Sequence, residues 1–365
     1  MENNQANHIY QALAKALGLV VLIIILLWLL SKIINALLIL VFAIVLAIII
    51  NAPVSALQKK GMKRGWASLI VFGSIVIFLT LLGWLVFPKI SGQFQQLVSN
   101  LPSYVENLSK RASDWFESIP AIGNKINEEG LNISKWMPSM PQTLLRIGNY
   151  SMSILGGLII FIIFVSMVVY AVVNPRPLLE IYFTWFKDGK KQKAANAFQQ
   201  ASKMLVGWFR ANLIGGGIEA VLVTAFLSIM NVPGAWVWGA LALFAELVPK
   251  IGFYIMSIPP ILVSLSVSPG TALWVTIFFL ALNEIMGDVV MPRLRSSTMS
   301  IHPVSTLFMM LAMASAFGFV GALLATPMAA IIKAYYYSFY ADEKSKDKQV
   351  EQYIDESIGL PAKKG

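Results

Sequence analysis

Residues 17–50 read LGLVVLIIILLWLLSKIINALLILVFAIVLAIII, an apolar stretch interrupted only by Ser31-Lys32 and Asn35. A helix needs about 20 apolar residues to cross a hydrocarbon core about 30 Å thick. Backbone polar groups find no water in that core, so spanning segments must be helices or closed barrels, and runs this long exclude a barrel. We therefore predict an all-α, polytopic membrane protein whose residues 17–50 form a tight helical hairpin of two spans turning at Ser31-Lys32.

The composition supports this class of protein. Of 365 residues, 57% are hydrophobic and only 13% are charged, which is far from the usage of soluble domains. There is no cysteine, and the two histidines, His8 and His302, are too few for a His-based metal motif. No Walker motif and no nucleophile with a nearby base can be found. We expect no enzymatic activity, no catalytic residue, no cofactor and no metal.

The remaining sequence divides by composition. A third span is predicted at 66–87, followed by a polar segment that predicts a small helical extracytoplasmic domain, either a cap or oligomer contact or a substrate vestibule. The predicted parts are residues 1–87 with spans one to three, 88–150 as the outer domain, 151–204 with span four and a basic amphipathic helix at the cytoplasmic headgroup layer, 205–340 as the transport core, and 341–365 as a tail.

Basic residues set the predicted orientation. KKGMKRG at 59–65 carries four basic residues and no acid, so this loop is expected in the cytoplasm. With two spans before it, the N-terminus would also be cytoplasmic, and so would the C-terminal tail. The net charge of +10 fits this bias and contact with the lipid bilayer, rather than binding of nucleic acid.

The C-terminal half contains two broken apolar stretches beside ordinary crossings. Residues 236–267 are interrupted at Pro249-Lys250-Ile251-Gly252, and 302–340 are too long for one span and carry Gly318, Gly321 and Pro327. The sequence thus predicts about six full spans plus two broken or re-entrant helical hairpins. If both stretches cross, Arg293 faces outward. If both are re-entrant, Arg293 faces the cytoplasm, which the distribution of basic residues favours.

Two candidate site residues are carboxylates near helix irregularities. Glu219 lies mid-span after Gly215-Gly216-Gly217, and a carboxylate there faces either a bundle interior that serves transport or a packing site. Glu246 precedes Pro249 by three residues and Gly252 by six. A break at membrane depth exposes helix ends that can bind ions, although an ordinary kink is the alternative.

Further candidates lie at the end of the ordinary crossing predicted at 271–290 and just beyond it. Glu284 and Asp288 are four residues apart and share a helix face, an arrangement that suits a proton carrier. A structural ion pair with the basic residues that follow, Arg293 among them, is the competing interpretation. His302 begins the last apolar segment and could titrate near neutral pH or act as an interfacial hydrogen-bonding residue.

Four segments of this half resemble the AI-2E family of bacterial inner-membrane proteins, also called PerM-type permeases. They are AELVPKIG (245–252), SIPPILVSL (257–265), NEIMGDVVMPRLRSSTMSIHPV (283–304) and FGFVGALLATPMAAIIKAYY (317–336). The matching positions are Pro249, Gly252, Pro292, Arg293, His302, Pro303, Gly318, Gly321 and Pro327. Lys250 stands where the family usually has tyrosine, and Asp288 stands where an amide is expected.

The resemblance implies a multi-pass transport protein of the bacterial inner membrane. Members of the family have been linked to export of the quorum signal autoinducer-2 and others to sodium/proton exchange. We therefore expect a secondary transporter that exports a small polar solute, coupled to protons or sodium, with Glu246, Glu284 and Asp288 providing charge compensation. The alternatives are a sodium/proton antiporter and a non-transporting membrane scaffold that binds an envelope partner. Assembly as a homo-oligomer fits each of these.

Overall fold

The computed structural model describes residues 2–117, 151–248, 251–295 and 301–341, together with residue 357. Within them every regular element is a helix, which confirms the all-α prediction. The elements are α1 (Glu2–Lys59), α2 (Arg64–Glu117), α6 (Ser151–Val173), α7 (Arg176–Thr184), the short 3-10 helix η1 (Asp188–Lys190), α8 (Lys191–Ile229), α9 (Ala235–Ala245), α10 (Ile251–Val267), α11 (Pro269–Glu284), the π-helix η2 (Ile285–Val290), α12 (Met291–Arg295), α13 (Pro303–Tyr336) and the π-helix η3 (Tyr337–Ala341).

Six of the described helical segments are long and apolar enough to cross a membrane. They are α1, α2, α6, α8, the run from α11 through α12, and α13 with η3. The prediction of a polytopic membrane protein is thus confirmed. By contrast, α9 and α10 have only 11 and 17 residues, short of the roughly 20 needed for a crossing.

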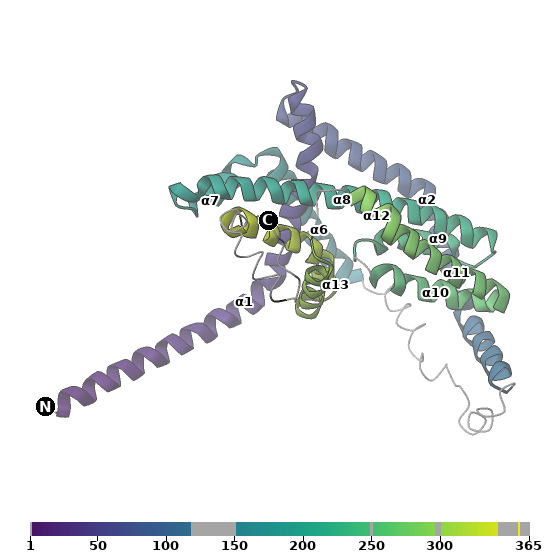
Figure 1. The fold of residues 1–365 in the computed structure, drawn as a ribbon, viewed down its shortest axis with the longest axis horizontal. Coiled ribbons are helices and arrows are strands. Elements are labelled where there is room, and N and C mark those ends of the chain that lie inside the picture. The colour runs from purple at the N-terminus through teal and green to yellow at the C-terminus, as the bar shows by residue number, and fades with distance from the viewer. Residues whose placement is uncertain (1, 118–150, 249–250, 296–300, 342–356, 358–365) are drawn as a thin grey trace.

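The predicted hairpin at Ser31-Lys32 is wrong, because α1 continues through it as one helix. Neither residue removes a backbone donor as proline does. Ser31 instead donates from its hydroxyl to the Trp28 carbonyl at 2.7 Å, and the Lys32 ammonium lies 5.8 Å from the centre of the Trp28 ring. The first half of α1 extends away from the other helices (Figure 1).

Helices α8 to α11 form a layer of antiparallel neighbours on one side of the molecule (Figure 1). A tight turn with Gly234 at φ 81° reverses the chain from α8 into α9. These two helices approach closely, since a Cβ added at Gly239 would lie 1.8 Å from the Thr224 hydroxyl. Their apolar faces, with those of α10 and α11, enclose one core that includes Val223, Leu227, Phe253 and Phe279.

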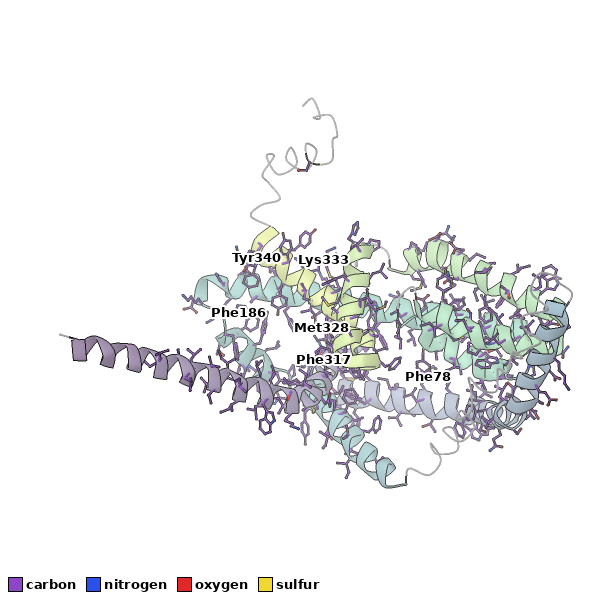
Figure 2. The ribbon with its side chains drawn as sticks, turned by 90° about the horizontal axis from the view of Figure 1, so that it is seen from below. Phe78, Phe186, Phe317, Met328, Lys333 and Tyr340 are labelled. Carbon is purple, nitrogen blue, oxygen red and sulfur yellow. The ribbon has the colours of Figure 1, made fainter. Side chains whose placement is uncertain are left out.

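Helix α13 is a bent pair of arms rather than one rod. At Gly318 the backbone leaves the helical region (φ 62°, ψ −144°), a conformation that favours glycine. A Cβ at Gly321 would lie 1.9 Å from the Met313 carbonyl oxygen, so the arms touch just beyond the bend. The predicted interruption is confirmed at Gly318, whereas the helix continues through Gly321 and Pro327. Figure 2 shows Phe317 at the bend and Lys333 toward the opposite end.

Helix α2 packs against α1 and α6 near its start, through Ala67 and Val71, and joins the core of α8 to α11 farther along, through Leu97. It continues past residue 87, where the outer domain was predicted to begin, to Glu117. The rest of that domain, 118–150, and nearly all of the predicted tail lie outside the described residues. On α2, the Gln93 Oε1 accepts a hydrogen bond from the Trp236 backbone N–H at 2.9 Å, and the Lys89 ammonium lies 4.2 Å from the Trp236 ring centre. The start of α9 is therefore attached to α2.

Candidate functional site

A pair of carboxyl groups lies where α8 meets the end of α9. The Glu219 side chain is fully buried, at 0% exposure. Its charged neighbour is Glu246, the residue that follows α9, whose side chain interacts with it electrostatically. The two carboxyl groups are close enough to share a hydrogen bond, and no other partner of the Glu219 oxygens lies among the described residues. Two carboxyl groups this close cannot both ionise without a proton or a cation between them, which is unusual for a pair kept only for packing.

The glycines of α8 allow other backbone segments to reach this level. A Cβ at Gly216 would lie 2.4 Å from the Leu243 carbonyl oxygen of α9, and one at Gly215 would lie 2.6 Å from the Met291 sulfur of α12. A Cβ at Gly217 would meet nothing within 4 Å. Two of the three consecutive glycines therefore serve close packing around the carboxyl pair, and the third does not.

The helix break after α9 is built on Gly252. The Val248 N–H donates to the Ala245 carbonyl at 3.1 Å, and the Gly252 N–H donates to the Val248 carbonyl at 3.0 Å. A Cβ at Gly252 would lie 2.1 Å from the Ala245 carbonyl oxygen, so only glycine allows the backbone of α10 to start this close to the end of α9. Pro249, the other predicted residue of the break, lies outside the described residues. Glu246 is thus the first residue of a non-helical connection.

The second predicted carboxylate pair has a different environment. Glu284 ends α11 and Asp288 lies in the π-helix η2, a type of segment found frequently at functional sites. Both side chains are exposed, as is that of Arg293 in α12. Among the residues that the structure describes, no ion pair joins Arg293 to either carboxylate. The structure does not place Glu284 and Asp288 in the buried environment of Glu219.

His302 caps α13 and borders a pocket. Its ring Nδ1 accepts a hydrogen bond from the Val304 backbone N–H at 3.3 Å. The pocket lies between the two arms of α13, and its volume is about 550 Å³. Three polar side chains there, Lys333, Tyr336 and Tyr337, were not predicted from the sequence. Their spacing places them on one helix face, but nothing in the sequence showed that this face would meet His302.

Arg64 was predicted only as one of the basic residues that orient the chain. Its guanidinium donates to the carbonyls of Val172 and Val173 at the end of α6, to the Gln58 side chain at 2.9 Å and to the Asn51 side chain at 2.6 Å. A cation is favourable at a helix C-terminus. Arg64 therefore joins the ends of α1, α2 and α6.

A cluster of aromatic side chains connects α7 to the C-terminal end of α13. The Tyr182 hydroxyl donates to the Ala194 carbonyl at 2.9 Å and accepts from the Tyr335 hydroxyl at 2.7 Å. Burial, and secondarily the hydrogen bond with Tyr335, raises the pKa of Tyr182 above its ordinary value. The Tyr182 hydroxyl consequently stays protonated and remains a donor throughout the physiological pH range.

Six apolar helices of crossing length define a multi-pass membrane protein. Residues 17–341 match the model of the AI-2E family transporter, and the chain belongs to this family. It is 22% identical to YueF of Bacillus subtilis over 303 residues, covering 78% of this chain and 79% of YueF. It is 24% identical to YhhT of Escherichia coli over 288 residues, covering 78% and 79%. Both names describe candidate transport proteins.

A relative from Synechocystis, also named as a candidate transport protein, is 23% identical over 292 residues, covering 78% of this chain and 72% of the relative. The sequence resemblance to the AI-2E family is therefore confirmed over most of the chain. Membership of a family of transporters agrees with a role in transport rather than in enzymatic catalysis.

Proposed function

We propose that the protein is a secondary transporter that exports a small polar solute, such as autoinducer-2, across the bacterial inner membrane, coupled to protons or sodium. The observation that carries this proposal is the Glu219 carboxyl group, fully buried in a membrane-spanning helix against Glu246. Ionisable groups at such positions are energetically expensive and mark ion or substrate pathways. Two carboxyl groups in contact can hold one proton or one small cation between them.

The helix break supports a cation at this position. Glu246 follows the C-terminal end of α9, and the C-terminal end of a helix carries a partial negative charge. In transporters with discontinuous helices, unwound carbonyls and helix C-termini coordinate coupling ions. The same feature favours the sodium/proton antiporter as the second candidate function, because it needs the ion site but no organic solute.

For the membrane arrangement we propose the re-entrant version. If the loop 59–65 is cytoplasmic, α2 runs outward, α6 inward and α8 outward, α9 and α10 form a hairpin entered from outside, and α11 returns inward. Arg293 and the C-terminus then face the cytoplasm, in agreement with the positive-inside rule. The argument that placed the N-terminus in the cytoplasm required two spans in residues 17–50, and it loses its basis because α1 is continuous.

The test is ion-coupled flux in proteoliposomes with Glu219→Gln and Glu246→Gln. Each variant should lower the dissipation of an imposed pH gradient, and the efflux of autoinducer-2, at least tenfold, because the amide cannot exchange a proton. Glu180→Gln is the matched control, since Glu180 is an exposed carboxylate that pairs with Arg176 on α7; it should behave as wild type. Glu284→Gln tests whether the exposed pair takes part.

The readouts separate the candidate functions. Loss of autoinducer-2 efflux together with loss of ion coupling supports the exporter. Gradient dissipation that needs only Na⁺ or Li⁺ supports the antiporter. Wild-type flux in both Glu219→Gln and Glu246→Gln would contradict a coupling role for the carboxyl pair.

A further inference from the structure

The pocket between the arms of α13 lies apart from the carboxyl pair and is not used in the proposed coupling. Its volume of about 550 Å³ falls in the range of sites for small organic molecules, roughly 300–1,000 Å³. The lining residues come from the start of the first arm and the end of the second: Ile301, His302, Val304, Ser305, Phe308, Met309, Ala329, Ile332, Lys333, Tyr336 and Tyr337.

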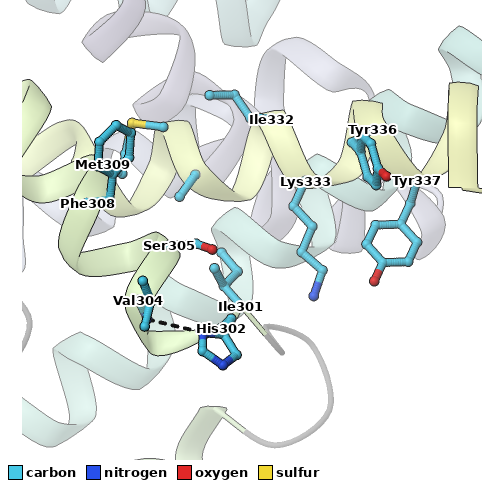
Figure 3. A pocket seen from close by; sticks show the side chains of 11 residues that line it. Ile301, His302, Val304, Ser305, Phe308, Met309, Ile332, Lys333, Tyr336 and Tyr337 are labelled. Carbon is cyan, nitrogen blue, oxygen red and sulfur yellow. Dashed lines mark hydrogen bonds between the residues drawn. The ribbon is translucent and has the colours of Figure 1, made fainter. Parts of the chain in front are cut away.

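The polar part of this lining can donate hydrogen bonds and carries positive charge. Lys333 and His302 are the ionisable nitrogen groups, and none of the eleven described lining residues is acidic. Figure 3 shows Lys333 pointing from one arm toward the space that His302 and Ser305 border from the other. The Lys333 ammonium also lies 5.4 Å from the centre of the Tyr337 ring, which helps to hold its position.

The local hydrogen bonding of His302 adds a donor to this set. Because Nδ1 accepts the Val304 N–H, a neutral His302 ring carries its proton on Nε2, where it is a donor. The same bond caps the start of α13, and the start of a helix is its partly positive end. A lysine, an imidazole and a serine hydroxyl together form an environment for an anion.

The remaining lining is apolar and supplies a second, distinct surface. Phe308, Met309 and Ile332 line the pocket together with Ala329, and Figure 3 shows Phe308 and Met309 at the end opposite to Tyr337. A free inorganic anion would leave this surface without contact. A ligand with both an anionic group and a compact apolar body would use both parts, in keeping with binding sites that combine apolar walls and a few convergent polar groups.

We propose that this pocket binds a small organic anion, with its carboxylate or phosphate group at Lys333 and His302 and its apolar body against Phe308, Met309 and Ile332. Such a group occurs both in soluble metabolites and in the heads of anionic lipids, so the shared chemistry defines the site. Binding here does not require that the bound anion is the solute that crosses the membrane.

The experiment uses the full chain in nanodiscs of phosphatidylcholine and titrates hexyl phosphate by calorimetry. Hexanol and hexyltrimethylammonium are the neutral and cationic comparison probes. Hexyl phosphate should bind saturably and at least tenfold more tightly than either. Lys333→Gln should weaken it about tenfold, as expected for loss of one charge-assisted hydrogen bond. The exposed Lys187 provides the matched control, and Lys187→Gln should bind as wild type.

A second variant keeps the site testable if Lys333→Gln fails to fold. Ser305 is exposed at the pocket, so Ser305→Trp should fill the space, preserve the fold and abolish binding. Nanodiscs containing phosphatidylglycerol separate the two ligand sources: competition with hexyl phosphate identifies a lipid head group, and its absence identifies a soluble anion. Equal binding of all three probes, or wild-type binding in both pocket variants, would overturn the proposal.

Discussion

Glu219 is the residue whose environment best separates a structural from a functional role. A carboxyl group kept for stability is expected to be hydrogen-bonded, because a buried polar group without partners destabilises the fold by about 1–3 kcal/mol. The hydrogen-bonding neighbour of Glu219 is another carboxyl group, Glu246, and no other partner of its oxygens lies among the described residues. A buried carboxyl group whose partner is another carboxyl group is what the proposed coupling role requires, and a stability measurement can separate that role from a structural one.

Replacing Glu219 by an apolar residue of similar length should thus not harm the fold. We expect Glu219→Met to leave the free energy of unfolding unchanged or to raise it by about 1 kcal/mol, as when buried charges are replaced by apolar groups, while ion-coupled flux is lost. Thermal unfolding in detergent measures the first effect. Leu227→Ala, at a fully buried position of the same helix, should cost about 2–5 kcal/mol and shows that the assay is sensitive.

A large loss of stability in Glu219→Met, comparable with that of Leu227→Ala, would mean that the carboxyl group is structural.

The sequence could place Glu219 in a span, because its neighbours are apolar, and it could place Glu246 near a break. It could not pair them, since they come from helices whose facing registers depend on Gly216 and Gly239 packing against distant backbone atoms.

At the scale of the element, the α8–α9 contact depends on particular glycines rather than on a glycine-rich stretch. Gly216 and Gly217 are adjacent in sequence but differ in what a side chain would meet. Glycine in a helix interior is less favourable than alanine by about 0.8–1.0 kcal/mol. Where space is open, alanine should therefore be accepted, and where a carbonyl lies at 2.4 Å, it should not.

Gly216→Ala should lower stability by about 1–3 kcal/mol, the usual effect of forcing extra volume into a packed interface. Gly217→Ala, the matched control one residue away, should be neutral or stabilising by up to about 1 kcal/mol. Apparent melting temperatures of the two variants in detergent provide the comparison. Equal effects would show that the α8–α9 backbone approach does not limit side-chain size.

Among the elements, prediction from sequence succeeded where a residue changes the backbone and failed where it changes only polarity. Gly318 bends α13 because its φ of 62° suits glycine. The fourth span, predicted at the start of the segment 151–204, forms α6 from Ser151 to Val173. Ser31-Lys32 are polar but have ordinary helical geometry, so α1 continues. Asp288 lies in a π-helix, which no pattern of polarity in the sequence indicated.

At the scale of the whole molecule, α1 is longer than a single crossing of the membrane requires. Its apolar stretch 17–50 contains 34 residues, which at 1.5 Å each span about 51 Å, well beyond a hydrocarbon core of about 30 Å. A tilt sufficient to hide this length would exceed the usual range of 0–40°. Part of α1 must therefore extend beyond the core or lie along its surface.

The continuity of α1 can be measured directly, because the protein has no native cysteine. Spin labels on Val20→Cys and Leu40→Cys, both exposed positions, should lie about 30 Å apart along a continuous helix of 20 residues. A hairpin turning at Ser31-Lys32 would bring them to about 10 Å, the spacing of packed helices. Pulsed dipolar spectroscopy in nanodiscs distinguishes these values.

Dilution with unlabelled protein removes distances between copies, so the measurement remains valid in a homo-oligomer. A short distance in the diluted sample would restore the two-span hairpin and, with it, the cytoplasmic N-terminus. The sequence alone could not decide between them, because Ser31-Lys32 is polar enough for a turn and is also compatible with an uninterrupted helix.

The contacts of Trp236 with Gln93 and Lys89 fix the start of α9 to α2, so α9 can move mainly by rotating about that end. The start of α9 contacts α2, and its end leads into the connection that begins with Glu246. The 11 residues of α9 separate these two ends by about 16 Å. A displacement that separates Glu246 from Glu219 must rotate α9 about its start at Trp236 or move α2 together with α9. A binding protein that immobilises α2 beside Gln93 and Lys89 should therefore slow movement at the proposed ion site without contacting it.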